Sequence, residues 1–159
     1  MINKLIKKAF TAAVLAPVLL LAFASIPAGA SPKITVLAFG LFGAQSVFDS
    51  EAKGAADIVA HRLDANAVVV RTNTKRRGDV TIASIEDELR TAAGQMDHEN
   101  DLLFLILTSH GSQAGVAVQA GRREQTLSPG ALAGMLSRTG VRHRVVVISA
   151  CYSGVFVRP

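Results

Sequence analysis

The only cysteine of this 159-residue chain lies at the end of a hydrophobic run. The run RVVVISACYSG (144–154) carries Cys151, and an earlier run, LLFLILTSHGS (102–112), leads to His110. A thiol is a good nucleophile only as the thiolate, and a nearby imidazole favours that form by accepting its proton or pairing with the anion. If the two runs form neighbouring strands, these residues therefore predict nucleophilic catalysis by a Cys-His pair.

Each of the two residues also has a simpler interpretation. A single cysteine at a strand end is usually a small buried hydrophobe, and a single histidine after a strand is usually a loop residue. The glycine next to the histidine favours the catalytic interpretation, because Gly111 allows a tight turn and directs a backbone N–H into the site. A helix beginning near Tyr152 would also point its N-terminal N–H groups at the thiolate and at a developing oxyanion.

The elements that must position these residues alternate between strands and helices. Continuous apolar runs bounded by turn residues predict four strands, over 33–39, 67–71, 101–107 and 144–149. We expect the third strand to be central. The fourth has the composition of a strand buried on both faces, but it leaves a sheet edge unpaired if it is the last strand. Apolar residues at helical spacing predict helices over 47–63 and 81–96.

A third helix and a hairpin complete the predicted elements. Ser128 as N-cap and Pro129 at the first helical position predict a helix that closes with Gly140. A short hairpin is expected over 115–127. This alternation indicates an α/β fold with a parallel sheet, in which active sites collect at the carboxyl ends of the strands.

The first thirty residues have the order of a secretory signal peptide. MINKLIKK is positively charged, AFTAAVLAPVLLLAFASIP is apolar and uncharged, and AGA at 28–30 has the small-x-small form of a cleavage site. We therefore expect residues 1–30 to be removed, residues 31–159 to form the domain, and the product to be secreted or periplasmic. The alternative is an uncleaved N-terminal membrane anchor, because the apolar run approaches the length that spans a bilayer. Pro17 and the AGA site favour cleavage, and membrane contact is expected only without it.

Export places the chain in an oxidising compartment. Cys151 has no second cysteine with which to form an internal disulfide. A free thiol is a liability in that environment, which is a further indication that it does chemistry.

Composition limits the classes of partner. Half of the residues are apolar, so the chain can bury a core and forms one domain at most. The net charge is +5, but three of the 17 basic residues lie in the first ten positions, which leaves 14 against 12 acidic residues after residue 30. That balance is not typical of a nucleic-acid-binding protein, and the basic cluster KRRGD (75–79) is interpreted as a solvated loop.

No metal or cofactor is expected. The acidic turn DHEND (97–101) fits no zinc spacing, and His61 and His143 are expected to be exposed. The sequence contains no phosphate-binding loop and no dinucleotide-binding fingerprint.

The segments around His110 and Cys151 resemble a known family. MDHENDLLFLILTSHGS (96–112) and LSPGALAGMLSRTGVRHRVVVISACYSG (127–154) are similar to the bacterial branch of the legumain family. These are cysteine peptidases of the caspase-hemoglobinase fold (clan CD). GAQSVFDSEA (43–52) resembles the branch more loosely, and the likeness runs from about Ile34 to Arg158.

The resemblance implies a fold, an activity and a set of roles. It implies a three-layer α/β/α domain and an endopeptidase that acts on peptides or proteins by acyl transfer. His110 matches the catalytic histidine and Cys151 the nucleophile, and the backbone N–H groups of Gly111 and Cys151 match the oxyanion hole. Some members place an asparagine after the first strand to orient the histidine. Here that region is FGLFGAQS, and Gln45 is the expected substitute.

The family domain normally continues with further strands after the cysteine, whereas this sequence ends at Pro159. The resemblance therefore implies a domain that is incomplete at its C-terminus. Two hypotheses follow: an exported cysteine endopeptidase, or a truncated non-catalytic homologue, a binding or vestigial domain that retains the dyad. A third is an exported α/β domain whose cysteine and histidine are incidental.

Overall fold

Four parallel strands form the sheet that carries the two candidate residues. The computed structural model describes residues 31–157, and the predicted signal peptide, residues 1–30, lies outside them. The strand order is β2-β1-β3-β7. Their bounds are β1 (Ile34–Gly40), β2 (Ala67–Thr72), β3 (Leu102–Thr108) and β7 (His143–Ser149). β3 pairs with both β1 and β7, so the prediction of a central third strand is confirmed.

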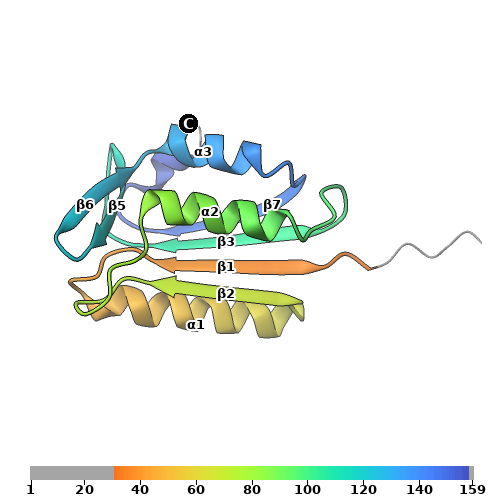
Figure 1. The fold of residues 1–159 in the computed structure, drawn as a ribbon, viewed down its shortest axis with the longest axis horizontal. Helices are drawn as coiled ribbons and strands as arrows, with labels where there is room; N and C mark the ends of the chain where they lie inside the picture. The colour runs from red at the N-terminus through yellow and green to blue at the C-terminus, as the bar shows by residue number, and fades with distance from the viewer. Residues whose placement is uncertain (1–30, 158–159) are drawn as a thin grey trace, which may run out of the picture. The chain divides into compact units, whose positions relative to one another are not determined.

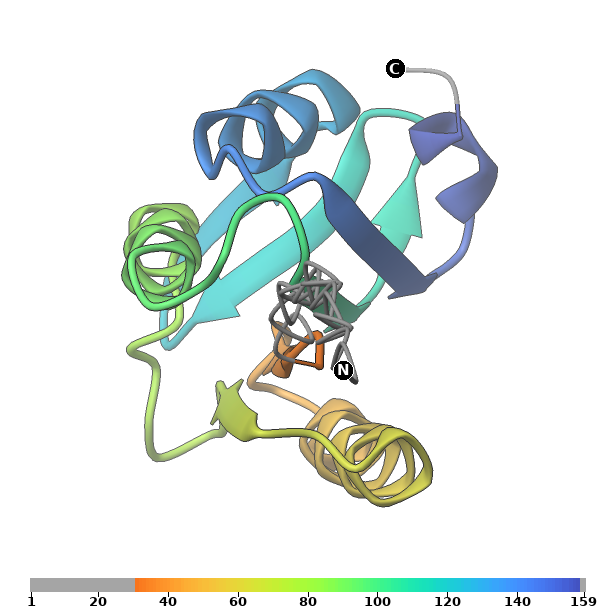
Figure 2. The same cartoon turned by 90° about the vertical axis from the view of Figure 1, so that its right-hand side faces the viewer.

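Three α-helices cover the two faces of the sheet: α1 (Ser46–Leu63), α2 (Ile82–Ala93) and α3 (Pro129–Arg138). α1 lies on one face, and α2 and α3 lie on the other (Figures 1 and 2). The side chain of Ser128 accepts a hydrogen bond from the N–H of Ala131, which confirms the predicted N-cap. α2 begins with a capping box between Thr81 and Ser84.

The alternation of side chains along β1 explains the three layers. Leu37 and Phe39 belong to a large buried cluster that includes residues of α2 and α3. Val36 and Ala38 belong to a smaller cluster with Ala56 of α1. Successive residues of a strand point to opposite faces, so an apolar strand of this kind is stable only when helices cover both sides. The predicted α/β/α arrangement is confirmed.

A small antiparallel sheet lies beyond the carboxyl ends of the parallel strands (Figure 1). It consists of β4 (Gly111–Ser112), β5 (Gly115–Ala120) and β6 (Arg123–Leu127), so the predicted hairpin is confirmed. The N–H of Ala117 donates to the carbonyl of His110 at 2.9 Å. The N–H of Gln119 donates to the carbonyl of Leu41 at 2.8 Å. The hairpin therefore supports the segments that follow β1 and β3.

The fourth strand has the composition of a strand buried on both faces, but it takes the alternative position, at an unpaired edge of the described sheet. β7 pairs only with β3 among the described strands and lies at the edge of the sheet. Val145, Val146 and Val147 are between 37% and 42% exposed. The run VVVI is as apolar as an interior strand, but an edge position leaves part of each valine uncovered. Two helices also end earlier than predicted, α2 at Ala93 and α3 at Arg138.

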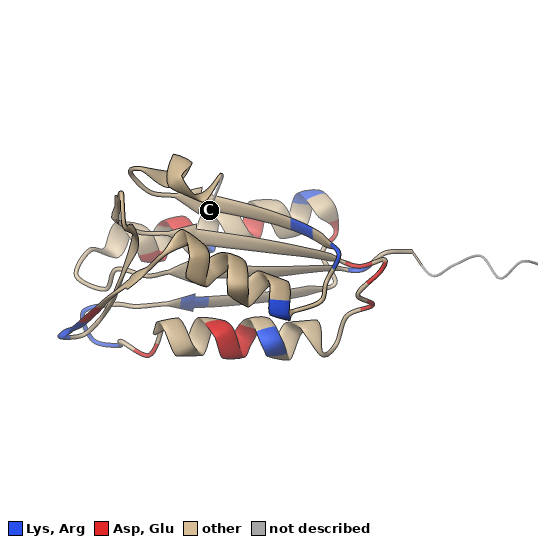
Figure 3. Cartoon of the chain, turned by 90° about the horizontal axis from the view of Figure 1, so that it is seen from above, with Lys and Arg blue, Asp and Glu red and all other residues tan. Residues whose placement is uncertain are grey.

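Charged side chains of both signs are distributed over the surface (Figure 3). Most of the ion pairs are short-range or exposed, such as Arg90 with Asp87 and Arg142 with Glu99. Surface pairs of this kind contribute little to stability. Within the described part of the chain, no helix combines the length and the hydropathy needed to cross a bilayer.

Candidate active site

The sheet brings His110 and Cys151 to the same edge. Thr108 of β3 and Ser149 of β7 lie opposite each other in the parallel register. The N–H of Ser109 donates to the carbonyl of Ser149 at 3.2 Å, which extends the pairing past the end of β3. His110 and Cys151 each follow two residues after this matched pair. The two candidate residues are therefore neighbours across two adjacent strands, as their sequence positions predict.

Gly111 lies directly against the segment that carries the thiol. A Cβ atom placed on Gly111 would lie 3.0 Å from the Cβ of Ala150 and closer still to the carbonyl oxygen of Cys151. Real side-chain carbons do not approach neighbours so closely, so only glycine fits. The sequence predicts a tight turn at this glycine. The structure adds close approach of two backbones as a reason for the glycine.

Two phenylalanine rings hold the imidazole of His110. Its ring centroid lies 4.7 Å from that of Phe42 and 4.9 Å from that of Phe48, and both contacts are edge-to-face. Phe42 comes from the loop after β1, and Phe48 is a buried residue in the first turn of α1. Such aromatic contacts restrict the orientation of a ring. Sequence reasoning missed both residues, although Phe42 lies in the segment FGLFGAQS and Phe48 in the segment GAQSVFDSEA.

Cys151 lies in an open, strained turn. Its thiol is exposed, and no hydrogen bond joins it to His110 in the part of the chain that the structure describes. The next residue, Tyr152, has a φ of 57°, a left-handed conformation that is uncommon for a bulky side chain. The turn leads into a short 3-10 helix, η1 (Ser153–Phe156), near the place where a helix was predicted.

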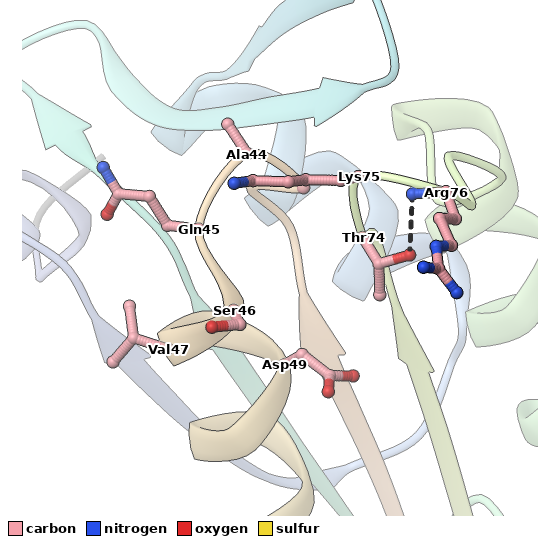
Figure 4. Close-up of a pocket in the computed structure, with 9 residues that line it drawn as sticks. Ala44, Gln45, Ser46, Val47, Asp49, Thr74, Lys75 and Arg76 are labelled. Carbon is pink, nitrogen blue, oxygen red and sulfur yellow. Dashed lines mark hydrogen bonds between the residues drawn. The ribbon is translucent and has the colours of Figure 1, made fainter.

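Gln45, the residue expected to orient His110, occupies the N-cap position of α1. It is exposed, and its side chain makes no hydrogen bond within the described residues. It lines a cleft of about 640 Å³ between the start of α1 and the loop after β2 (Figure 4). Lys75 and Arg76 line the opposite side of this cleft, so the predicted solvated loop borders a hollow next to the site. The role assigned to Gln45 stays a prediction.

Two carboxylates of α1 bind hydroxyl groups at the ends of the strands. Asp49 accepts a hydrogen bond of 2.5 Å from Thr72, the last residue of β2, and pairs with Lys53 at 2.9 Å. The hydrogen bonds from Lys53 and then Thr72 lower the pKa of Asp49 below its usual value. Glu51 accepts hydrogen bonds from Thr108 of β3 and, at 2.6 Å, from Ser149 of β7. Sequence reasoning did not identify either carboxylate.

Asn73 fixes the loops that border the cleft. This buried residue donates to the carbonyls of Leu41 and Val80 at 3.1 and 2.8 Å and accepts from the N–H of Val80 at 2.9 Å. It thereby joins the segment after β1 to the segment before α2. A fully bonded buried amide of this kind rigidifies its surroundings.

The other histidines lie apart from this edge. His61 and His143 are exposed, as predicted, and Nε2 of His98 lies 3.0 Å from the carbonyl oxygen of Ala93. In the DHEND turn, hydrogen bonds from the Asn100 side chain and the Glu99 N–H lower the pKa of Asp97. Among residues 31–157, no three histidine, cysteine or acidic side chains are grouped so that they could hold a metal ion.

One protein-family model matches the part of the chain that contains both candidate residues. The model of the peptidase C13 family matches residues 85–159, a segment that contains β3, β7 and both candidate residues. No curated protein matches the chain. The matched family is the legumain family of clan CD, and the parallel sheet flanked by helices is consistent with its caspase-hemoglobinase fold. Peptidases act on peptides or proteins, so the match gives the class of substrate. Over residues 85–159 the chain therefore resembles the cysteine-type peptidases of the legumain family.

Proposed function

We propose that this chain is an exported legumain-type endopeptidase that cleaves peptide bonds by acyl transfer through Cys151 and His110. One observation carries the proposal: the segments His110–Gly111 and Ala150–Cys151 pack against each other at the ends of the neighbouring strands β3 and β7. A nucleophile and a base must come within reach of one substrate carbonyl, and this arrangement supports that requirement.

The reaction divides into two halves. His110 accepts the thiol proton, and the thiolate of Cys151 attacks the carbonyl carbon of the peptide. The tetrahedral intermediate collapses, the C–N bond breaks, and the imidazolium gives its proton to the leaving amine. Water, deprotonated by the same imidazole, then hydrolyses the thioester and releases the acid. In the described residues the thiol and imidazole are not hydrogen-bonded, and such bonds often tighten only when substrate is bound.

The backbone N–H groups of Gly111 and Cys151 are the proposed oxyanion hole. The N–H of Cys151 donates to no other group among the described residues, so it is available to a substrate oxygen. Gly111 packs against the segment Ala150–Cys151 and carries no side chain that would block the approach of a substrate carbonyl. Backbone donors aimed at a developing oxyanion contribute substantially to acyl transfer.

Export rests on the order of charge, apolar residues and small residues in positions 1–30. We propose cleavage after Ala30 and a secreted or periplasmic location for the product. An uncleaved segment would instead anchor the chain to a membrane. Mass spectrometry of exported protein distinguishes the two, because the proposal expects Ser31 as the first residue and an intact N-terminus in the membrane fraction would contradict it.

The pairing of Cys151 with His110 is tested by alkylation. The rate of reaction of Cys151 with iodoacetamide is measured against pH in the wild type and in His110→Ala. We expect a rate at neutral pH well above that of a model thiol in the wild type, and the loss of most of this excess in the variant. Equal rates in both proteins, each matching a model thiol, would contradict the dyad.

A non-catalytic homologue that retains the dyad is the second candidate. The thiol of Cys151 is exposed and makes no hydrogen bond to His110 among the described residues. This favours the second candidate, because a general base must reach the proton that it accepts. Hydrolysis of a panel of fluorogenic peptides, with Cys151→Ala as the control, separates the two candidates. Turnover that disappears in the variant supports the peptidase. Binding without turnover, together with a reactive thiol, supports the homologue.

A further inference from the structure

One carboxylate on α1 joins the two strands that carry the candidate dyad. Glu51 accepts a hydrogen bond from Thr108 on one carboxylate oxygen and from Ser149 on the other. Thr108 and Ser149 are the matched pair at the ends of β3 and β7. The carboxylate therefore bridges two strands on the face of the sheet that α1 covers. Ser149 and Glu51 are 98 residues apart in the sequence, so the bridge exists only in the folded chain.

The bridge lies immediately before both candidate residues. His110 follows Thr108 by two positions, and Cys151 follows Ser149 by two positions. The same helix also supplies Phe48, whose ring packs against the imidazole of His110. One turn of α1 therefore contacts His110 directly through Phe48. Through Glu51 it also holds Thr108 and Ser149, from which the segments leading to His110 and Cys151 start. A shift of α1, or of one strand past the other, would change the distance between thiol and imidazole.

The charge of Glu51 is not engaged elsewhere in the described part of the chain. Asp49, on the same helix, pairs with Lys53, whereas the hydrogen bonds of Glu51 come only from the two hydroxyl groups. A carboxylate is the strongest acceptor available to a hydroxyl donor, and its two oxygens suit two donors on adjacent strands. This arrangement suits a clamp rather than a surface ion pair.

We propose that Glu51 is a positioning residue that fixes the ends of β3 and β7 relative to each other, so that His110 and Cys151 remain within reach. The proposal rests on the proposed peptidase function and adds a residue that neither the family match nor the motif around the dyad assigns. Glu51 acts through Thr108 and Ser149 and does not need to contact substrate.

Substitutions of Glu51 separate a clamp from an effect of charge. In Glu51→Gln the carboxamide accepts from one hydroxyl and donates to the other, so the bridge survives without the charge. In Glu51→Ala both bonds are lost. We expect Glu51→Ala to lower the alkylation rate of Cys151 at neutral pH several-fold, within the limit of about 30-fold by which full ionisation raises the thiolate fraction of a thiol of ordinary pKa. Glu51→Gln should retain most of that rate.

The control is Asp57→Ala, which removes another exposed carboxylate from α1 without breaking a hydrogen bond of the described residues. It should leave the rate and its pH profile unchanged. Ser149→Ala removes one arm of the bridge and should not add to the effect of Glu51→Ala in the double variant, because both act on the same contact. Ser149→Ala also serves as the test if Glu51→Ala does not fold.

The pH profile and amide exchange decide the outcome. A loss of helix packing alone would lower the unfolding temperature without changing the pH dependence of alkylation in folded protein. Equal rates in Glu51→Ala, Ser149→Ala and the wild type would overturn the clamp, and so would equal losses in Glu51→Gln and Glu51→Ala. If wild-type Cys151 reacts like a model thiol, the proposed function fails, and hydrogen exchange still tests the clamp. Exchange at residues 109–111 and 149–151 should accelerate in Glu51→Ala but not in Glu51→Gln, and unchanged exchange in both would overturn it.

Discussion

Replacing Gly111 with alanine perturbs the closest backbone approach in the candidate active site. The added Cβ would lie 3.0 Å from the Cβ of Ala150 and nearer still to the carbonyl oxygen of Cys151. Carbon atoms in contact prefer separations of about 3.5–4.0 Å. Because the carbonyl oxygen is the limiting contact, the segments His110–Gly111 and Ala150–Cys151 must move apart by about 1 Å or more.

The displacement has two measurable effects. Overpacking of this kind destabilises a protein by about 1–3 kcal/mol, which lowers the unfolding temperature of a domain of this size by roughly 3–15 °C. A misplacement of about 1 Å between reacting groups lowers the rate by about 100-fold. We therefore expect Gly111→Ala to lose most of the excess reactivity of Cys151 at neutral pH and most of its peptide hydrolysis, at temperatures where the protein is still folded.

The assay compares this variant with Gly54→Ala. Gly54 lies within α1 and a Cβ there would have no neighbour within 4 Å. Alanine in a helix is favoured over glycine by about 1 kcal/mol, so this control should be more stable and equally reactive. If Gly111→Ala keeps the wild-type unfolding temperature and alkylation rate, the close approach of the two segments is not present in solution and the reasoning is refuted.

Two further predictions concern the supports of the site. Asn73→Ala should destabilise the domain by about 2–3 kcal/mol, because it leaves the buried N–H of Val80 without its acceptor, and chemical denaturation measures this loss; a change below about 0.5 kcal/mol would contradict it. Asp49→Asn should destabilise the domain at pH 7, because the lowered pKa of Asp49 shows that the fold favours the carboxylate through Lys53 and Thr72. The stabilisation is present above the unfolded pKa of about 3.9 and is lost as the pH falls through the lower folded value. The difference from wild type in denaturation curves should therefore shrink toward pH 3, and a difference independent of pH would contradict the assignment.

The sequence was sufficient to predict the elements that carry His110 and Cys151. Apolar runs bounded by turn residues located β3 and β7 within a residue or so, and their parallel pairing follows from the alternation with helices. The positions of His110 and Cys151 at strand ends were accordingly predictable. The roles of the two residues, the oxyanion hole and the export segment stay predictions.

Contacts between distant segments were not predictable in the same way. An acidic residue on a helical repeat such as Glu51 looks like any solvated side chain until the fold places Thr108 and Ser149 beside it. The exposure of β7 is not encoded in its own residues, because an apolar run has the same sequence in the interior and at the edge of a sheet. Phe42 was missed because a phenylalanine in a loop belongs to no periodic pattern from which its contact with His110 could be predicted.

The left-handed residue after Cys151 gives the molecule an intrinsic optical label. The chain has no tryptophan and a single tyrosine, Tyr152, which is 61% exposed and follows Cys151 directly. All tyrosine emission from the protein therefore originates beside the thiol, while the core of aliphatic side chains and phenylalanine contributes almost nothing at the same wavelength. Modification of Cys151, or a peptide seated over the turn, can be followed in unlabelled protein through this one ring.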